Sequence, residues 1–178
     1  QLLAETEGAA AINRTIDETY GTIVREAQES MAGGVSLSCM YITWETYQCG
    51  NVLSLIVSCG WGFDMNTHSV YLYDTATGEQ MTTAQLLETL QVEPETFLAA
   101  VRQAAAERFD GKYAGIGGDT DELVAERRAW TLSDENINLD VMTYADAAGN
   151  LYVYLPIGSI AGAASYEEPL TLDLGAAG

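Results

Sequence analysis

The side chains with which this chain could do chemistry are one histidine, three cysteines and 26 aspartates and glutamates. His68 stands at the junction of a polar loop and a predicted strand, where a structural imidazole is more common than a catalytic one. The sequence has no Gly-x-Ser-x-Gly nucleophile elbow, and one histidine cannot supply a histidine-rich zinc site. We therefore predict no catalytic residue, no metal site and no cofactor.

The acidic residues offer two further kinds of site. The run Asp119–Glu122 carries the oxygen ligands that calcium prefers, but its spacing differs from that of an EF-hand loop. A helix-capping box formed by Asp119 and Glu122 explains the same residues. Any two carboxylates could serve as the acid and the base of a glycosidase, although no spacing marks out a pair. An enzyme that processes glycan with paired carboxylates is therefore an alternative prediction.

The cysteines Cys39, Cys49 and Cys59 are spaced evenly around a predicted hairpin tip at residues 49–51. If the apolar residues of the two arms lie on one face of the hairpin, the sequence numbers of two residues paired across it must sum to an odd value. A shift of the pairing by one residue would move the apolar residues of one arm to the opposite face. The sequence numbers of Cys39 and Cys59 sum to an even value, so these two residues are not paired directly in that register. The pattern therefore favours three free thiols, and only a bulge near the tip would allow a Cys39–Cys59 bridge.

Aromatic side chains crowd the first three predicted strands; they are Tyr41, Trp44, Tyr47, Trp61, Tyr71 and Tyr73. Rings of this kind that face outward from a rigid sheet commonly engage carbohydrate or protein surfaces, whereas cross-strand aromatic pairs stabilise the sheet itself. Trp61, Phe63 and Tyr71 lie beside a polar loop at residues 64–67, and loops set on rigid strands often carry recognition. We predict these three as the ligand-binding residues.

The elements that position these side chains follow from hydrophobic periodicity. The pattern predicts helices over 12–31, from Thr82 or Thr83, from Pro94, and over 119–125. It predicts strands over 35–47, 52–63, 69–73, 130–132, 137–144, 151–155 and 170–174. The fold class is α+β, a mostly antiparallel sheet with helices packed on one face. Residues 1–11 are a flexible lead-in, and residues 12–178 form a single α+β domain or two subdomains, 12–67 and 68–178.

The charge of the chain restricts its partners. Only seven Lys and Arg residues oppose the 26 acidic ones, which gives a formal net charge of −19. Such a surface repels nucleic acid and anionic lipid headgroups, and it attracts cationic proteins or divalent cations. No apolar run approaches the roughly 18 residues of a spanning helix. We expect no nucleic-acid partner and no direct membrane insertion by this chain, which begins at Gln1 like a fragment whose anchor has been removed.

Several segments resemble one family. They are Ile12–Asn13, the hairpin over 35–63, Tyr73–Glu79 followed by Leu86–Leu87, Gly149–Val153 and Ser159–Ala163. Together they resemble the RsiV/PdaC-type ectodomain, paired domains of unknown function in Firmicutes cell-envelope proteins. That family includes the extracellular part of a lysozyme-sensing anti-sigma factor and the noncatalytic part of a peptidoglycan deacetylase. The chain differs from many relatives at Gly60–Ser69, where they carry a glycine-rich segment ending in His-Gly.

The resemblance and the charge together imply a noncatalytic extracellular binding or sensing module, exposed on the cell surface. Its expected partner is a cationic protein such as lysozyme, or cell-wall glycan. Two alternatives stay open: a cell-wall glycan-processing enzyme that uses paired carboxylates, and a structural spacer domain.

Overall fold

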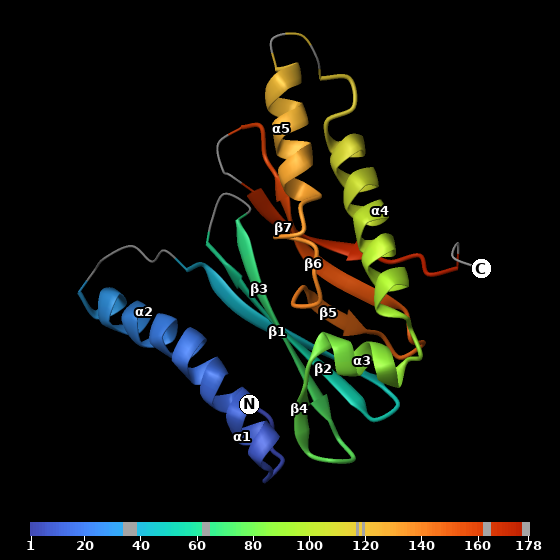
Figure 1. The fold of residues 1–178 in the computed structure, drawn as a ribbon. Coiled ribbons are helices and arrows are strands. Elements are labelled where there is room, and N and C mark those ends of the chain that lie inside the picture. Colours follow the sequence, from blue (N-terminus) through green and yellow to red (C-terminus); the bar gives the residue numbers. More distant parts are fainter. Residues whose placement is uncertain (34–38, 62–64, 117, 119, 162–164, 176–178) are drawn as a thin grey trace. The chain divides into compact units, whose positions relative to one another are not determined.

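The computed structural model describes residues 1–33, 39–61, 65–116, 118, 120–161 and 165–175 (Figure 1). The chain divides into two compact units, unit 1 from Gln1 to Thr82 and unit 2 from Thr83 to Gly178. The subdomain boundary expected between residues 67 and 68 would cut through a strand, β3 (Asn66–Asp74), which pairs along its whole length with the strand before it. The division lies instead after that sheet is complete.

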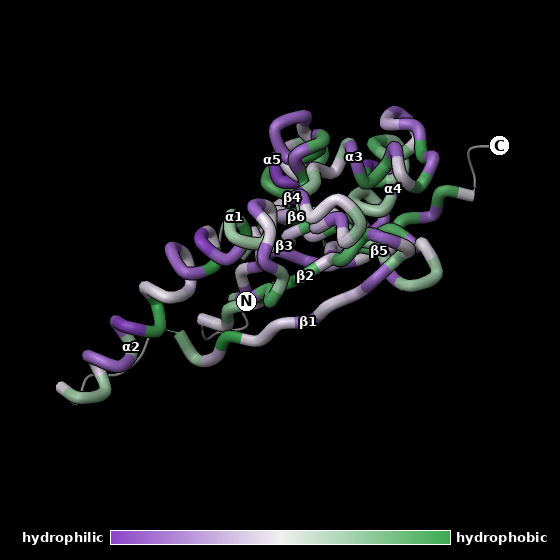
Figure 2. The backbone as a smooth tube through the Cα atoms, turned by 90° about the horizontal axis from the view of Figure 1, so that it is seen from below, coloured by the Kyte–Doolittle hydropathy of each residue, from purple (hydrophilic) through white to green (hydrophobic). Residues whose placement is uncertain are grey.

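Unit 1 begins with a helical segment made of α1 (Glu7–Ile16), the π-helical turn η1 (Asp17–Gly21) and α2 (Thr22–Ala32). The helix starts before residue 12, so much of the predicted lead-in is structured. Thr6 is the reason: its hydroxyl accepts a hydrogen bond from the Ala9 amide at 3.2 Å and caps the helix. Farther on, α2 buries none of its residues, and its tube in Figure 2 mixes hydrophilic and hydrophobic stretches.

The sheet of unit 1 has the order β1-β2-β3-β4 and is antiparallel throughout. Its strands are β1 (Tyr41–Cys49), β2 (Val52–Gly60), β3 and β4 (Glu79–Met81). The β1–β2 register runs from Tyr41 opposite Gly60 to Cys49 opposite Val52, so paired numbers sum to an odd value, which confirms the predicted parity. The short strand β4 was not predicted from the sequence.

The turn between β3 and β4 holds α1 against the sheet. Asp74 begins this turn and accepts hydrogen bonds from the amides of Ala76 and Thr77, which lowers the pKa of its carboxyl. Gly78 has a φ of +78°, and its carbonyl oxygen accepts a hydrogen bond from the Gly8 amide at 3.2 Å. A side chain at Gly8 would lie 2.5 Å from backbone atoms of this turn. The turn from Asp74 to Gly78 is therefore a docking point for the first helix.

Unit 2 packs helices on a three-stranded antiparallel sheet of order β5-β6-β7. Its elements are α3 (Thr83–Thr89), α4 (Pro94–Lys112), α5 (Asp121–Thr131), β5 (Met142–Ala145), β6 (Leu151–Gly158) and β7 (Ser165–Thr171). Helices α4 and α5 lie side by side and contact β6 (Figure 1). The core between them includes the fully buried residues Phe97, Val101, Phe109, Leu151, Val153, Leu155 and Ile157. The α+β fold class is confirmed, with two sheets in place of one.

Three predicted strands of unit 2 differ from the structure. Residues 130–132 close helix α5, because the helical stretch after Asp121 extends beyond Ala125. The strand predicted over 137–144 is reduced to β5, and the last strand is β7 rather than 170–174. Pro156 lies inside β6, which the sequence pattern did not predict. The strand tolerates it because β5 pairs only with residues 151–154, so Pro156 lies beyond the end of β5.

Candidate functional site

Unit 1 contains an apolar groove between the N-terminal segment, the first helix and the edge of the sheet. We call it the β1 groove. Its volume is about 280 Å³, and it is lined by Gln1, Leu2, Ile16, Tyr20, Ile42, Trp44, Thr46, Leu55 and Val57. Alternation along β1 places Ile42, Trp44 and Thr46 on the same face of the sheet. The lining is apolar enough to hold hydrocarbon.

Tyr20 forms part of the floor of the groove. It is the buried residue of the π-helical turn η1, and its ring is only 6% exposed. Its hydroxyl hydrogen-bonds to the Ser69 hydroxyl at 2.8 Å and to the Val57 carbonyl oxygen at 3.3 Å. The turn thus fixes the helix to β2 and β3 with a specific polar contact at the base of an apolar surface. Single π-helical turns of this kind are frequently found at functional sites.

The N-terminal segment forms one wall of the groove, and Asn13 holds it in place. The Asn13 side-chain oxygen accepts a hydrogen bond from the Leu2 amide at 2.7 Å, and its amide nitrogen donates to the Leu2 carbonyl oxygen at 2.8 Å. Leu2 then packs against the buried core of unit 1. The wall is therefore fixed by two hydrogen bonds, which reduces the ordering cost of binding a ligand there.

Trp44 is the most exposed aromatic side chain on the rim. It is 70% exposed and lies on β1, opposite Val57 of β2. β1 is an edge of the sheet: within the described residues it pairs with β2 alone. Trp44 is one of the aromatic residues of the predicted strands, but it is not among the three predicted ligand-binding residues. The signal available was its position on the same face as Ile42, whereas its exposure depends on β1 being the edge strand.

The predicted ligand-binding residues do not come together as an exposed patch. Tyr71 is 6% exposed and belongs to the core, where burial raises the pKa of its hydroxyl although a hydrogen bond with Ser69 opposes the shift. Trp61 is half-buried against that core, and its indole N–H donates to the Thr67 hydroxyl at 2.9 Å. Phe63 lies outside the described residues. Tyr71 is therefore a packing residue, because its strand position turns it toward the helix.

His68 lies opposite Ser58 in the β2–β3 ladder, and its Nδ1 atom is 2.8 Å from the Ser58 hydroxyl oxygen. Burial lowers the pKa of His68, and the nearby Glu45 carboxylate acts in the opposite direction. A serine, a neutral imidazole and a carboxylate are the parts of a nucleophilic triad. Ser58, however, lies within a regular strand rather than at the sharp turn that exposes a catalytic serine beside an oxyanion hole. The pair is thus explained as a cross-strand contact.

The acidic segment predicted as a helix cap lies at the start of α5. Asp119 is outside the described residues, and Thr120 stands at the N-cap without a side-chain capping bond. Asp121 and Glu122 occupy the first turn, where carboxylates interact favourably with the helix dipole. Across the described ranges, no group of three or more histidine, cysteine, aspartate or glutamate side chains is arranged to hold a metal ion.

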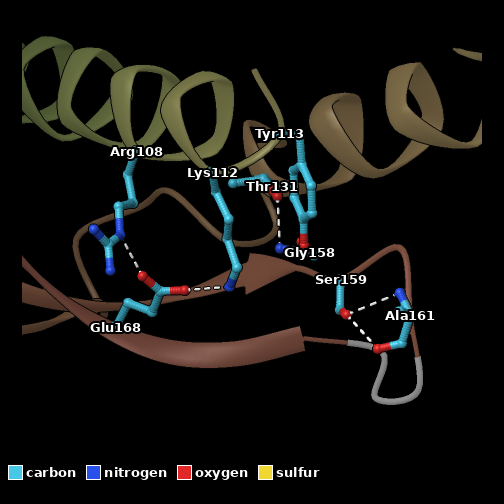
Figure 3. A network of polar contacts seen from close by, with 8 residues as sticks. All are labelled: Arg108, Lys112, Tyr113, Thr131, Gly158, Ser159, Ala161 and Glu168. Carbon is cyan, nitrogen blue, oxygen red and sulfur yellow. Dashed lines mark hydrogen bonds and ion pairs between the residues drawn. The ribbon is translucent and has the colours of Figure 1, made fainter. Parts of the chain in front are cut away.

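Unit 2 contains a closed polar network around Glu168 of β7 (Figure 3). The carboxylate is buried and accepts hydrogen bonds from Arg108 and, at 2.5 Å, from Lys112, both on α4. Burial raises the pKa of Glu168, but these two cations outweigh that effect, so the pKa is lowered. In the same network the hydroxyls of Tyr113 and Thr131 bond to the backbone of Gly158. The network joins the helices to the sheet and leaves its charges paired.

A second concave surface of unit 2 is lined by Glu135, Asn136, Asn138, Asp140, Val141, Met142, Tyr154 and Pro156, with a volume of about 260 Å³. Tyr154 stacks at 5.9 Å on Tyr144, which in turn stacks at 5.0 Å on Tyr152. We call this surface the tyrosine face. Of the three tyrosines, Tyr154 lines the surface, and an aromatic ring beside amide and carboxylate groups suits sugars and other amphipathic ligands.

Comparison with known proteins gives no assignment: no family model matches the chain, and no curated protein matches it either. Among the described residues, no helix combines the length and the apolar character needed to cross a bilayer.

Proposed function

We propose that this chain is a noncatalytic extracellular binding or sensing module of a bacterial cell-envelope protein, and that it recognises a cationic protein through the β1 groove. The observation that carries the proposal is Trp44, 70% exposed at the rim of an apolar groove in an acidic unit. Unit 1 holds ten aspartates and glutamates against only two arginines, Arg14 and Arg25. One of the two arginines is already paired, since Arg25 lies 3.7 Å from Asp17.

A lysine or arginine of the partner fits this combination of groups. Its aliphatic stem would lie in the groove against Ile42 and Leu2, while its charge would stack over the exposed indole of Trp44. The ten carboxylates of unit 1 would raise the rate of encounter with a positively charged surface. Exposed tryptophan at a pocket rim is also the residue type that most often dominates the free energy of a protein interface.

Resemblance to the RsiV/PdaC-type ectodomain supports the same proposal. Two of the segments that carry the resemblance have defined roles in unit 1: Asn13 fixes the wall of the groove, and Asp74–Gly78 docks α1. Because that family includes a lysozyme-sensing ectodomain, lysozyme is the cationic protein to test first.

The test is a calorimetric titration with lysozyme at low salt and at near-physiological salt. Saturable binding that survives the higher salt is expected, and Trp44→Ala should weaken it at least about tenfold. Tyr41→Ala is the matched control, because Tyr41 is an exposed aromatic on the same strand but on the opposite face. Binding that disappears with salt, or equal effects of the two substitutions, would contradict recognition through the β1 groove.

The tyrosine face supports a second candidate partner, cell-wall glycan. Tyr154 and the two asparagines beside it offer a stacking surface and amide groups, and Glu135 and Asp140 add carboxylates. Titration with soluble peptidoglycan fragments should show binding that Tyr154→Ala removes and Trp44→Ala leaves unchanged. Release of reducing ends during the titration would instead favour the glycan-processing alternative. The absence of binding to both glycan and lysozyme would leave the spacer role.

A further inference from the structure

Two cysteines of unit 1 lie close together although they are not partners in the sheet. The Sγ atoms of Cys39 and Cys59 are 3.1 Å apart. This distance is about 1 Å longer than a disulfide bond, so small side-chain rotations would bring the sulfurs to bonding distance. Cys49, the third cysteine, lies at the other end of β1 from Cys39.

The register of the strands explains why the two sulfurs lie close together although Cys39 and Cys59 are not paired across the hairpin. Cys59 of β2 lies opposite Ile42, as the odd sum requires. Cys39 precedes β1 by two residues and is therefore free of the strict alternation of the strand. The chain at this point is still held to β2, because the Met40 amide donates to the Gly60 carbonyl oxygen at 2.7 Å. The departure from strict alternation that brings Cys39 to Cys59 thus lies at the end of β1 away from the hairpin tip. A bulge near the tip, which the sequence pattern predicted as the condition for this bridge, is not what brings the two sulfurs together.

The two thiols differ in environment. Cys59 is fully buried in the core of unit 1, whereas Cys39 is half-buried at its margin. Burial, together with the neighbouring Cys39, raises the pKa of Cys59 to about 12. The thiolate is the reactive form of cysteine, so Cys39 is the sulfur that a reagent from solution reaches first and Cys59 is the resolving partner.

We propose that Cys39 and Cys59 are a disulfide-forming pair, oxidised by thiol–disulfide exchange with a small disulfide such as oxidised glutathione. The Cys39 thiolate attacks one glutathione sulfur, forms a mixed disulfide and releases one glutathione thiolate. Cys59 then loses its proton and attacks the Cys39 sulfur, which releases the second glutathione. The protein loses two protons and two electrons, and one oxidised glutathione takes them up to become two reduced molecules.

The bond would attach the start of β1 to the central strand β2. β1 is the edge strand that carries Trp44, and edge strands have hydrogen-bond partners on one side only. Oxidation would therefore resist fraying of the strand that forms the rim of the β1 groove. The inference does not depend on the proposed function, because it rests on the two sulfurs and their surroundings alone.

The experiment uses the whole chain and a Cys49→Ser variant in a glutathione redox buffer, followed by alkylation of the remaining thiols and mass spectrometry. Trypsin does not cut between Arg25 and Arg102, so a glutamate-specific protease that cleaves after Glu45 separates Cys39 from Cys59. We expect a linked pair of peptides two mass units below the sum of the reduced ones. Oxidation should also raise the thermal midpoint of unit 1, on the order of 10 °C.

Cys39→Ser is the key control, because Cys39 is half-buried and its replacement leaves the core intact. This variant should show no linked peptides and no shift of the midpoint with redox potential. The proposal is overturned if Cys39 and Cys59 are both alkylated after equilibration with oxidised glutathione. It is also overturned if Cys39 stops at the mixed disulfide with glutathione, or if Cys49 forms the bond in the wild-type chain.

Discussion

The two units share an architecture but use their charged side chains differently. Each packs helices on one face of an antiparallel sheet. Within the described residues of unit 2, four of the five cations form ion pairs: Arg102 with Asp134, Arg108 and Lys112 with Glu168, and Arg128 with Asp110. Among the residues of unit 1 that the structure describes, Arg25 alone forms one, with Asp17. Unit 2 therefore uses its cations to hold its own elements together, whereas the described part of unit 1 combines a single ion pair with an exposed Trp44.

The helices of the two units also differ in how much of their surface is buried. Helix α4 of unit 2 buries Phe97, Val101, Ala105 and Phe109 along one stripe, while α2 of unit 1 buries no residue. Most of the stability of a helix in a protein comes from packing its apolar face. The comparison indicates that the packed part of the first helical segment ends near η1. Substitutions at the contacts that stabilise each unit test this difference.

The largest expected effect is in the closed network of unit 2. Glu168→Ala leaves Arg108 and Lys112 without their shared carboxylate and should destabilise the protein by about 2–3 kcal/mol. Asp134→Ala breaks the ion pair with Arg102 at an 88% exposed carboxylate and should cost less than about 0.5 kcal/mol. Urea unfolding followed by circular dichroism measures both. Equal losses for the two variants would show that burial does not distinguish these pairs.

A second prediction concerns the docking of α1 in unit 1. Gly8→Ala places a methyl group 2.5 Å from backbone atoms of Gly78 and Gln80, which cannot move as a side chain can. We expect a loss of about 2 kcal/mol. Gly111→Ala is the matched control in α4: its added carbon meets nothing within 4 Å, and it should stabilise the protein by up to about 1 kcal/mol. Hydrogen exchange of the α1 amides measures the effect locally. Unchanged protection in Gly8→Ala would contradict the docking role.

The smallest expected effect is a dependence of stability on pH. The folded-state pKa of Glu168 is lowered from its ordinary value of 4.5. The ion pairs therefore contribute fully above that pH, and their contribution is lost as the pH falls through the folded pKa. Unfolding midpoints between pH 6 and pH 3 should decline more steeply in the wild type than in Glu168→Gln. Parallel curves would show that this carboxyl is not stabilised by its partners. The comparison with Glu168→Gln isolates the contribution of Glu168. It is needed because Asp74, Asp110 and Asp146 also have lowered pKa values, which affect both proteins alike.

Much of the fold follows from local patterns. Pro94 opens α4 as predicted, and Gly78 takes the positive φ that the turn after Asp74 requires. The odd register of β1 and β2 follows from alternation alone. The errors occur where local patterns compete: residues 130–132 are rich in strand-forming side chains, yet they continue a helix that packs on β6. Contacts distant in sequence decided that segment.

Less of the candidate site than of the fold could be predicted from the sequence. Strand alternation shows which residues share a face, but it does not show which face a helix will cover or which strand will be the edge. Tyr71 and Trp44 are both strand aromatics, and only the placement of α1 and η1 makes one a core residue and the other an exposed rim. The same reason applies to Cys39, whose approach to Cys59 depends on where β1 begins.

The sequence by itself determined the α+β class, the parity of the first hairpin, the turn at Asp74–Gly78 and the net charge of −19, because each depends on composition or on neighbouring residues. The tertiary structure alone decided that the units divide after Thr82, that β1 is an edge and that Glu168 is paired inside unit 2. These features depend on contacts between residues far apart along the chain, and such contacts leave no local pattern.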